Sequence, residues 1–96
     1  MTGIRELIGK RDRILTLASQ YGIKSIKVFG SVARGDDKRG SDVDFLVNFE
    51  EGRTLFDLIE FKNELEELLD RKVDVITENA IHWYLKEKIM QEAVEI

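Results

Sequence analysis

Cysteine, proline and histidine are absent or almost absent from this chain. Its 96 residues include no cysteine, no proline and a single histidine, His82. Without cysteine there is no disulfide framework and no thiolate metal site, and one histidine does not make an imidazole ligand set. No apolar stretch approaches the roughly 18 residues of a membrane span, and the amphipathic N-terminal segment does not resemble a signal peptide. These absences predict a cytoplasmic protein with no membrane partner.

Basic charge is scarce in the second half of the chain. Residues 1–47 carry nine basic and six acidic side chains, whereas residues 48–96 carry six and 13, and the net charge of the whole chain is −4. An acidic chain neutralises phosphates poorly, which argues against a long nucleic acid as a direct partner. The acidic half suits either contact with a basic protein or a solvated helix face.

The spacing of apolar residues predicts a single domain over residues 1–96. Helices are predicted over about residues 3–20, 54–70 and 79–93, and strands ending at residue 30 and spanning about residues 42–48 and 73–76. Thr54 and Asn79 are the expected N-caps of the second and third helices, and Ser31 is expected to cap a short helical turn. The predicted fold is α/β (α+β), with a three-stranded mixed sheet flanked by helices.

Two of the predicted helices are expected to bury apolar stripes. These stripes are Leu55, Leu58, Ile59, Leu65, Leu68 and Leu69 on one helix, and Ile81, Leu85, Ile89 and Ala93 on the other. In the middle strand, Val43, Phe45 and Val47 alternate with Asp42 and Asp44, so carboxylates and most of the hydrophobes face opposite sides.

The expected topology brings the polar residues together. A full helix joins the second and third strands, as is usual for parallel neighbours, which places Asp42, Asp44 and Asp74 near one end of the sheet. An antiparallel first strand would bring Gly30 and Ser31 to the same end. Taken singly, the Gly-Ser pair is an ordinary turn and the acids are ordinary solvated groups.

Asp74 stands between apolar neighbours in its strand. An ionised carboxylate buried there needs a cation, strong hydrogen bonds or a path to water, because burial without them costs several kcal/mol. A metal site would supply the cation. The alternative is an edge strand on which Asp74 faces solvent.

Phe29, Gly30 and Ser31, followed by a spacer and then Asp42-Val43-Asp44-Phe45, form a motif that resembles the minimal nucleotidyltransferases of the DNA polymerase beta superfamily. Asp74 matches the third carboxylate of that family. Two further segments, Gly-Ser-Val-Ala-Arg-Gly-Asp at residues 30–36 and the ending at residues 89–96, are similar to the small antitoxin branch, which is encoded beside a HEPN-domain toxin.

The resemblance implies a nucleotidyltransferase fold and an antitoxin that transfers AMP from ATP to a tyrosine of a cognate HEPN ribonuclease toxin. It implies two Mg²⁺ ions held by Asp42 and Asp44, with Asp74 helping to hold the first and to deprotonate the attacking hydroxyl. The implied phosphate-binding residues are Gly30 and Ser31. Arg34, Lys38 and Arg39 lie in or beside the spacer loop, where they either steady the leaving pyrophosphate or are simply solvated, and Arg34 and Arg39 are the predicted nucleotide-binding residues among them. The alternatives are an antitoxin that binds nucleotide but blocks its toxin sterically, and nucleotidyl transfer to a small molecule.

Overall fold

The computed structural model describes residues 4–35, 42–81 and 83–96. Helices and strands alternate along most of the chain. In order they are α1 (Ile4–Gly9), α2 (Arg11–Gln20), β1 (Ile23–Phe29), α3 (Gly30–Arg34), β2 (Val43–Phe49), α4 (Leu55–Leu69), β3 (Val73–Thr77), the 3-10 helix η1 (Glu78–Ala80), α5 (Trp83–Glu92) and β4 (Val94–Glu95). Within these ranges no helix is long and apolar enough to cross a membrane.

The strands form one mixed sheet in the order β3-β2-β1-β4. The predicted pairings are confirmed, because β2 runs parallel to β3 and antiparallel to β1. The predicted number of strands is wrong, because the C-terminal residues add β4 antiparallel to β1. This strand has only two residues, Val94 and Glu95, which is too short to show a period of two in the sequence.

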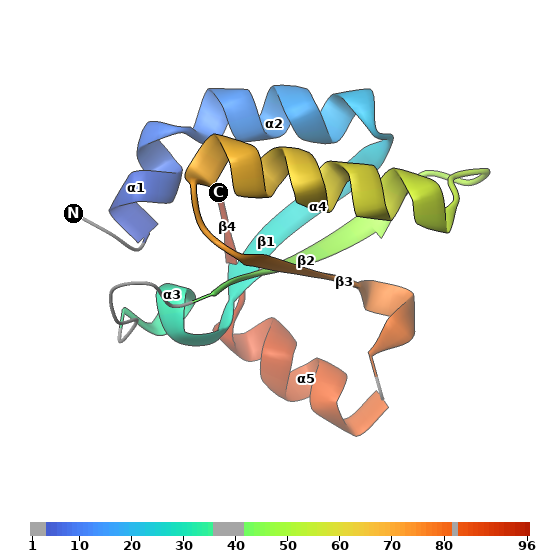
Figure 1. Cartoon of the computed structure of the whole chain (residues 1–96). Coiled ribbons are helices and arrows are strands. Elements are labelled where there is room, and N and C mark those ends of the chain that lie inside the picture. The colour runs from blue at the N-terminus through green and yellow to red at the C-terminus, as the bar shows by residue number, and fades with distance from the viewer. Residues whose placement is uncertain (1–3, 36–41, 82) are drawn as a thin grey trace.

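Helices cover both faces of the sheet. α2 and α4 lie over one face and α5 lies on the other, whereas α3 lies at the end of the sheet, after β1 (Figure 1). Val32 of α3 is buried in the same core as residues of α2 and α4. The alternation predicted for β2 is confirmed, since Val43, Phe45 and Val47 are fully buried in the main core with residues of α2 and α4. Leu46 points to the opposite face and is buried as well, so β2 is covered on both sides.

The predicted N-terminal and C-terminal helices differ from those observed. The predicted N-terminal helix is divided into α1 and α2 at Lys10. The preceding residue, Gly9, is a poor helix former. The Lys10 Nζ atom donates a hydrogen bond to the Leu68 carbonyl at 3.0 Å. Asn79 is not an N-cap, because it lies within η1 and α5 begins four residues later, at Trp83. Leu85, expected in the buried stripe of this helix, is 43% exposed.

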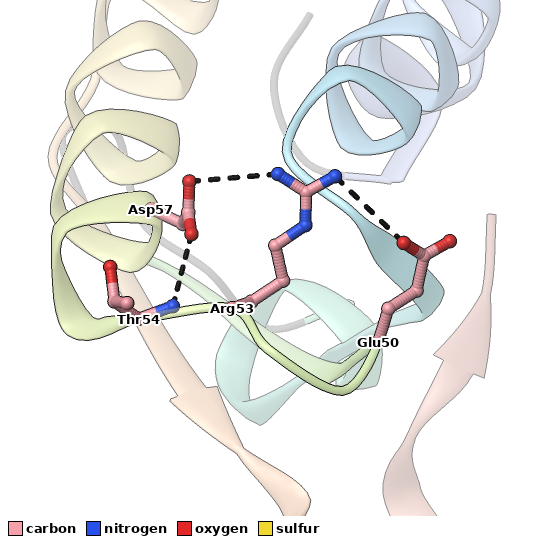
Figure 2. Close-up of polar contacts among 4 residues, drawn as sticks. All are labelled: Glu50, Arg53, Thr54 and Asp57. Atoms are coloured by element: carbon pink, nitrogen blue, oxygen red, sulfur yellow. Dashed lines mark hydrogen bonds and ion pairs between the residues drawn. The ribbon is translucent and has the colours of Figure 1, made fainter.

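The start of α4 agrees with the prediction. Thr54 is the N-cap, and its backbone N–H donates to Asp57 at 3.0 Å (Figure 2). Arg53 forms ion pairs of 3.8 Å with both Glu50 and Asp57. A Cβ atom at Gly22 would collide with the Arg53 side chain, and Glu50 N–H donates to the Gly22 carbonyl at 2.8 Å. The start of α4 is therefore held beside the residue that precedes β1.

The buried stripe of α4 was predicted only in part. Leu65 and Leu69 are buried as expected, but Phe61, which was not in the predicted stripe, is buried with them. The prediction that Leu55 and Ile59 are buried is wrong, because they are 67% and 47% exposed. Residues 61, 65 and 69 recur every four positions and define the face toward the sheet, and helix geometry turns residues 55 and 59 away from it.

Candidate active site

The predicted site residues meet where β1 ends and β2 and β3 begin. Asp44 is the cross-strand partner of Phe29 on one side and of Asp74 on the other. Side chains of directly paired residues lie on the same face of a sheet, with Cβ atoms about 5 Å apart. The two carboxylates and the Gly30-Ser31 segment that follows Phe29 are thus brought together by strand register.

Gly30 packs directly against Asp44. Its φ angle is +76°, a left-handed conformation that side chains disfavour, and a Cβ atom at this position would collide with the Asp44 Oδ2 atom. Both constraints demand glycine. The backbone can therefore approach the carboxylate more closely than it could with any other residue here.

Ser31 lies one residue further into α3 than predicted. The N-cap of this helix is Phe29, which has an extended backbone and makes no side-chain capping bond, and the helix begins at Gly30. The expected cap at Ser31 is wrong because the chain enters the helix directly from β1. Ser31 stays in the first turn, where backbone N–H groups have no partner within the helix.

The pKa of Asp44 is shifted by its surroundings. Partial burial raises its pKa from 3.8 to about 6, and the negative charges of Asp74 and Asp42 and a hydrogen bond with Asp74 act in the same direction. The positive charge of Arg34 opposes them. The clustered carboxylates repel one another, so bound positive charge would stabilise their ionised form.

Asp42 and Asp74 are both exposed. Asp42 precedes β2, rather than opening it as expected. Asp74 lies on β3, an edge strand, where Val73 points inward and Asp74 points to solvent. Burial therefore does not oblige Asp74 to bind a cation, and the alternative, an edge strand on which Asp74 faces solvent, is the one observed. Its position beside Asp44 is what relates it to the site.

Arg34 contacts the C-terminal helix. Its Nη1 atom lies 3.3 Å from Glu92 Oε2, which links α3 to α5 across 58 positions of sequence. Sequence reasoning missed Glu92, because no local pattern reveals a contact between residues so distant. The other loop bases, Lys38 and Arg39, lie outside the described residues, as does His82.

The carboxylates suit a magnesium ion whose coordination shell is completed by water and a bound ligand. In the described parts of the chain, no three His, Cys, Asp or Glu side chains are close enough to hold a metal by themselves. Mg²⁺ does not need such a cage, since it is usually bound by one or two carboxylates, with water and substrate phosphates completing the shell. Adjacent Asp44 and Asp74, with exposed Asp42 two residues before Asp44, supply donors of the right kind.

A comparison with protein families matches most of the chain. The family model described as a nucleotidyltransferase domain matches residues 11–96. The chain belongs to the nucleotidyltransferase family. The resemblance that the Gly-Ser and Asp-Val-Asp motif suggested is confirmed by this match.

Two relatives of this nucleotidyltransferase carry functional names. One, from Methanocaldococcus jannaschii, is named as a candidate protein adenylyltransferase; it is 46% identical over 86 residues, or 90% of this chain and 92% of the relative. The other, from Thermococcus cleftensis, is named protein adenylyltransferase MntA; it is 38% identical over 80 residues, or 83% of this chain and 81% of the relative.

Solved structures share the nucleotidyltransferase fold. A candidate minimal nucleotidyltransferase is 40% identical and superposes with a TM-score of 0.89 over 99% of this chain and 97% of that one. A tri-AMPylated Shewanella oneidensis HEPN toxin in complex with an MNT antitoxin matches with a TM-score of 0.69 at 17% identity, over 94% of this chain and 70% of that one. At that identity the second likeness concerns the fold alone.

Proposed function

We propose that this nucleotidyltransferase is a magnesium-dependent protein adenylyltransferase that acts as an antitoxin. It transfers AMP from ATP to a tyrosine of a cognate HEPN-domain ribonuclease toxin. The observation that carries the proposal is the register that sets Asp44 beside Asp74 and packs Gly30 against Asp44. The two relatives named for protein adenylyltransferase activity support a protein as the acceptor.

The nucleotide-binding role rests on the segment around α3. Gly30 has no side chain to block the approach of a phosphate, and the Ser31 hydroxyl and first-turn N–H groups donate hydrogen bonds. Arg34 contributes positive charge near Asp44. We assign the same role to Arg39 on its position in the motif alone.

The carboxylates carry the chemistry. The acceptor oxygen forms a bond to the α-phosphorus of ATP, the bond to the bridging oxygen of the β-phosphate breaks, and pyrophosphate leaves. A tyrosine hydroxyl has a pKa of about 10, so its proton must be drawn away, and we assign this role to Asp74, an exposed carboxylate beside Asp44. Asp42, Asp44 and Asp74 would hold magnesium, whose positive charge would neutralise the triphosphate.

The experiment compares Asp74→Asn with Asp70→Asn. Both aspartates are exposed, and Asp70, the C-cap of α4 with a φ angle of 53°, tolerates asparagine in that conformation. Each protein is incubated with ATP, magnesium and the protein encoded by the adjacent gene, which the proposal requires to be a HEPN toxin. Intact masses record the adenylate groups added, fragment masses locate them, and ribonuclease activity is assayed after the proteins are separated.

The wild type and Asp70→Asn should place adenylate on a toxin tyrosine and leave the toxin inactive after separation. Asp74→Asn should bind the toxin without modifying it. If the wild type leaves the toxin unmodified and its ribonuclease activity returns on separation, the protein is a steric antitoxin and the enzymatic proposal is wrong.

A further inference from the structure

Three large apolar side chains at the start of α4 are open to solvent. Leu55, Phe56 and Ile59 are 67%, 75% and 47% exposed, and their spacing of one, three and four residues gathers them on one side of the helix. We call these three residues the α4 patch. A cluster of large apolar side chains on the surface is typical of a protein contact.

The α4 patch lies far from the carboxylates. The contacts of Glu50 and Arg53 with Gly22 hold the start of α4 near the beginning of β1, whereas Gly30 and Asp44 lie at its end. Figure 1 shows α3 and the first turn of α4 at opposite ends of the sheet. At about 3.3 Å per residue, a strand of seven residues separates them by roughly 20 Å. The patch is therefore not part of the nucleotide site.

The charges of α4 indicate which kind of partner the α4 patch would bind. The helix carries five acidic side chains and one basic one, Lys62, which follows Ile59 by three residues. Of the acids, Asp57 is paired with Arg53, and exposed Glu60 follows Phe56 by one helical turn. Negative charge of this kind repels nucleic acids and anionic lipid surfaces. A second copy of the chain, paired about a twofold axis, would set these carboxylates against one another. A basic protein surface is the complementary partner.

We propose that the α4 patch docks the acceptor protein, through apolar side chains of the partner that are flanked by lysine or arginine. This inference rests on the proposed function, because it names a surface by which the same acceptor is held. One acceptor must reach across the roughly 20 Å from the patch to Asp44, and the surface of a folded protein spans that distance. Docking so far from the reacting atoms contributes equally to the ground and transition states, so it lowers KM without changing kcat.

The test uses the double variant Leu55→Ser/Phe56→Ser with Ile8→Ser as the matched control. Ile8 is 58% exposed on α1, at the other end of the molecule from the start of α4 (Figure 1). The probe is the same protein encoded by the adjacent gene, which the proposed function requires to be a HEPN toxin. Calorimetry without nucleotide gives Kd, and adenylation kinetics give kcat and separate KM values for toxin and ATP.

The double variant should weaken Kd by roughly tenfold to a hundredfold, as expected for the loss of two central apolar contacts. Its KM for the toxin should rise in parallel, while kcat and the KM for ATP stay at wild-type values and Ile8→Ser behaves as wild type. Wild-type binding should also weaken as salt is added, and Glu60→Gln should reduce that dependence.

The outcomes separate the two proposals. If the wild type adenylates the toxin and the double variant keeps the wild-type Kd and KM, the docking inference is overturned while the proposed function stands. If the wild type binds the toxin through the patch without modifying it, docking is supported and the proposed function fails. If sedimentation shows that the wild type forms a dimer that the double variant loses, with toxin binding unchanged, the patch is a self-association surface and docking is overturned.

Discussion

Replacing Gly30 with alanine tests the close packing at the centre of the site. The φ angle of +76° imposes a conformational cost on alanine of about 1–2 kcal/mol. The added Cβ would also collide with Asp44 Oδ2, so the carboxylate must rotate away from its place beside Asp74. Gly52 offers a matched control, because its φ angle is +85° and a Cβ there would meet nothing within 4 Å.

Both Gly30→Ala and Gly52→Ala should lower the free energy of unfolding by about 1–2 kcal/mol in urea denaturation, because both place alanine in the left-handed region. Only Gly30→Ala should damage adenylate transfer. Displacement of a catalytic group by about 1 Å costs on the order of a hundredfold in rate, and we expect a loss of that size in kcat. Calorimetry with ATP and magnesium should show weaker nucleotide binding in the same variant.

Two results would refute this reasoning. Wild-type transfer by a folded Gly30→Ala would mean that Asp44 does not need its observed position. Equal losses of transfer in Gly30→Ala and Gly52→Ala would mean that the effect is one of global stability, and that contact with Asp44 is not its cause.

Three further variants test the electrostatics and the start of α4. Folding raises the pKa of Asp44 from 3.8 to about 6, so ionised Asp44 destabilises the metal-free fold, and Asp44→Asn should stabilise it at pH 7 by about 1–2 kcal/mol after allowance for solvent screening. Thermal melts should show this gain shrinking as pH falls from 6 to below 4, where wild-type Asp44 is protonated; a gain independent of pH contradicts the assignment. Arg34→Gln should weaken ATP binding in magnesium roughly tenfold by calorimetry, and an unchanged Kd removes Arg34 from the nucleotide site. Asp57→Ala removes the bond to the Thr54 N–H and should cost about 1 kcal/mol in urea denaturation, and an unaltered midpoint would show that this cap is dispensable.

The sequence by itself determined the features that depend on near neighbours. The alternation of Val43, Phe45 and Val47 with polar residues revealed both the strand and its buried face. Thr54 was recognisable as an N-cap because capping involves residues within one helical turn. The helix between β2 and β3 is long enough to cross over the sheet, so their parallel pairing followed from connectivity. The expectation that Gly30, Asp44 and Asp74 lie at one end of the sheet came from these local elements and the order of the strands.

Tertiary structure alone decided the features that depend on distant neighbours. The burial of Phe61 and the exposure of Leu55 were set by which face of α4 packs on the sheet, and both residues are apolar, so composition does not distinguish them. Asp74 is exposed because β3 lies at the edge of the sheet, a property of strand order rather than of its apolar neighbours. The contact of Arg34 with Glu92 joins residues 58 positions apart. Sequence patterns extend over one or two helical turns, so they do not reveal a contact over that separation.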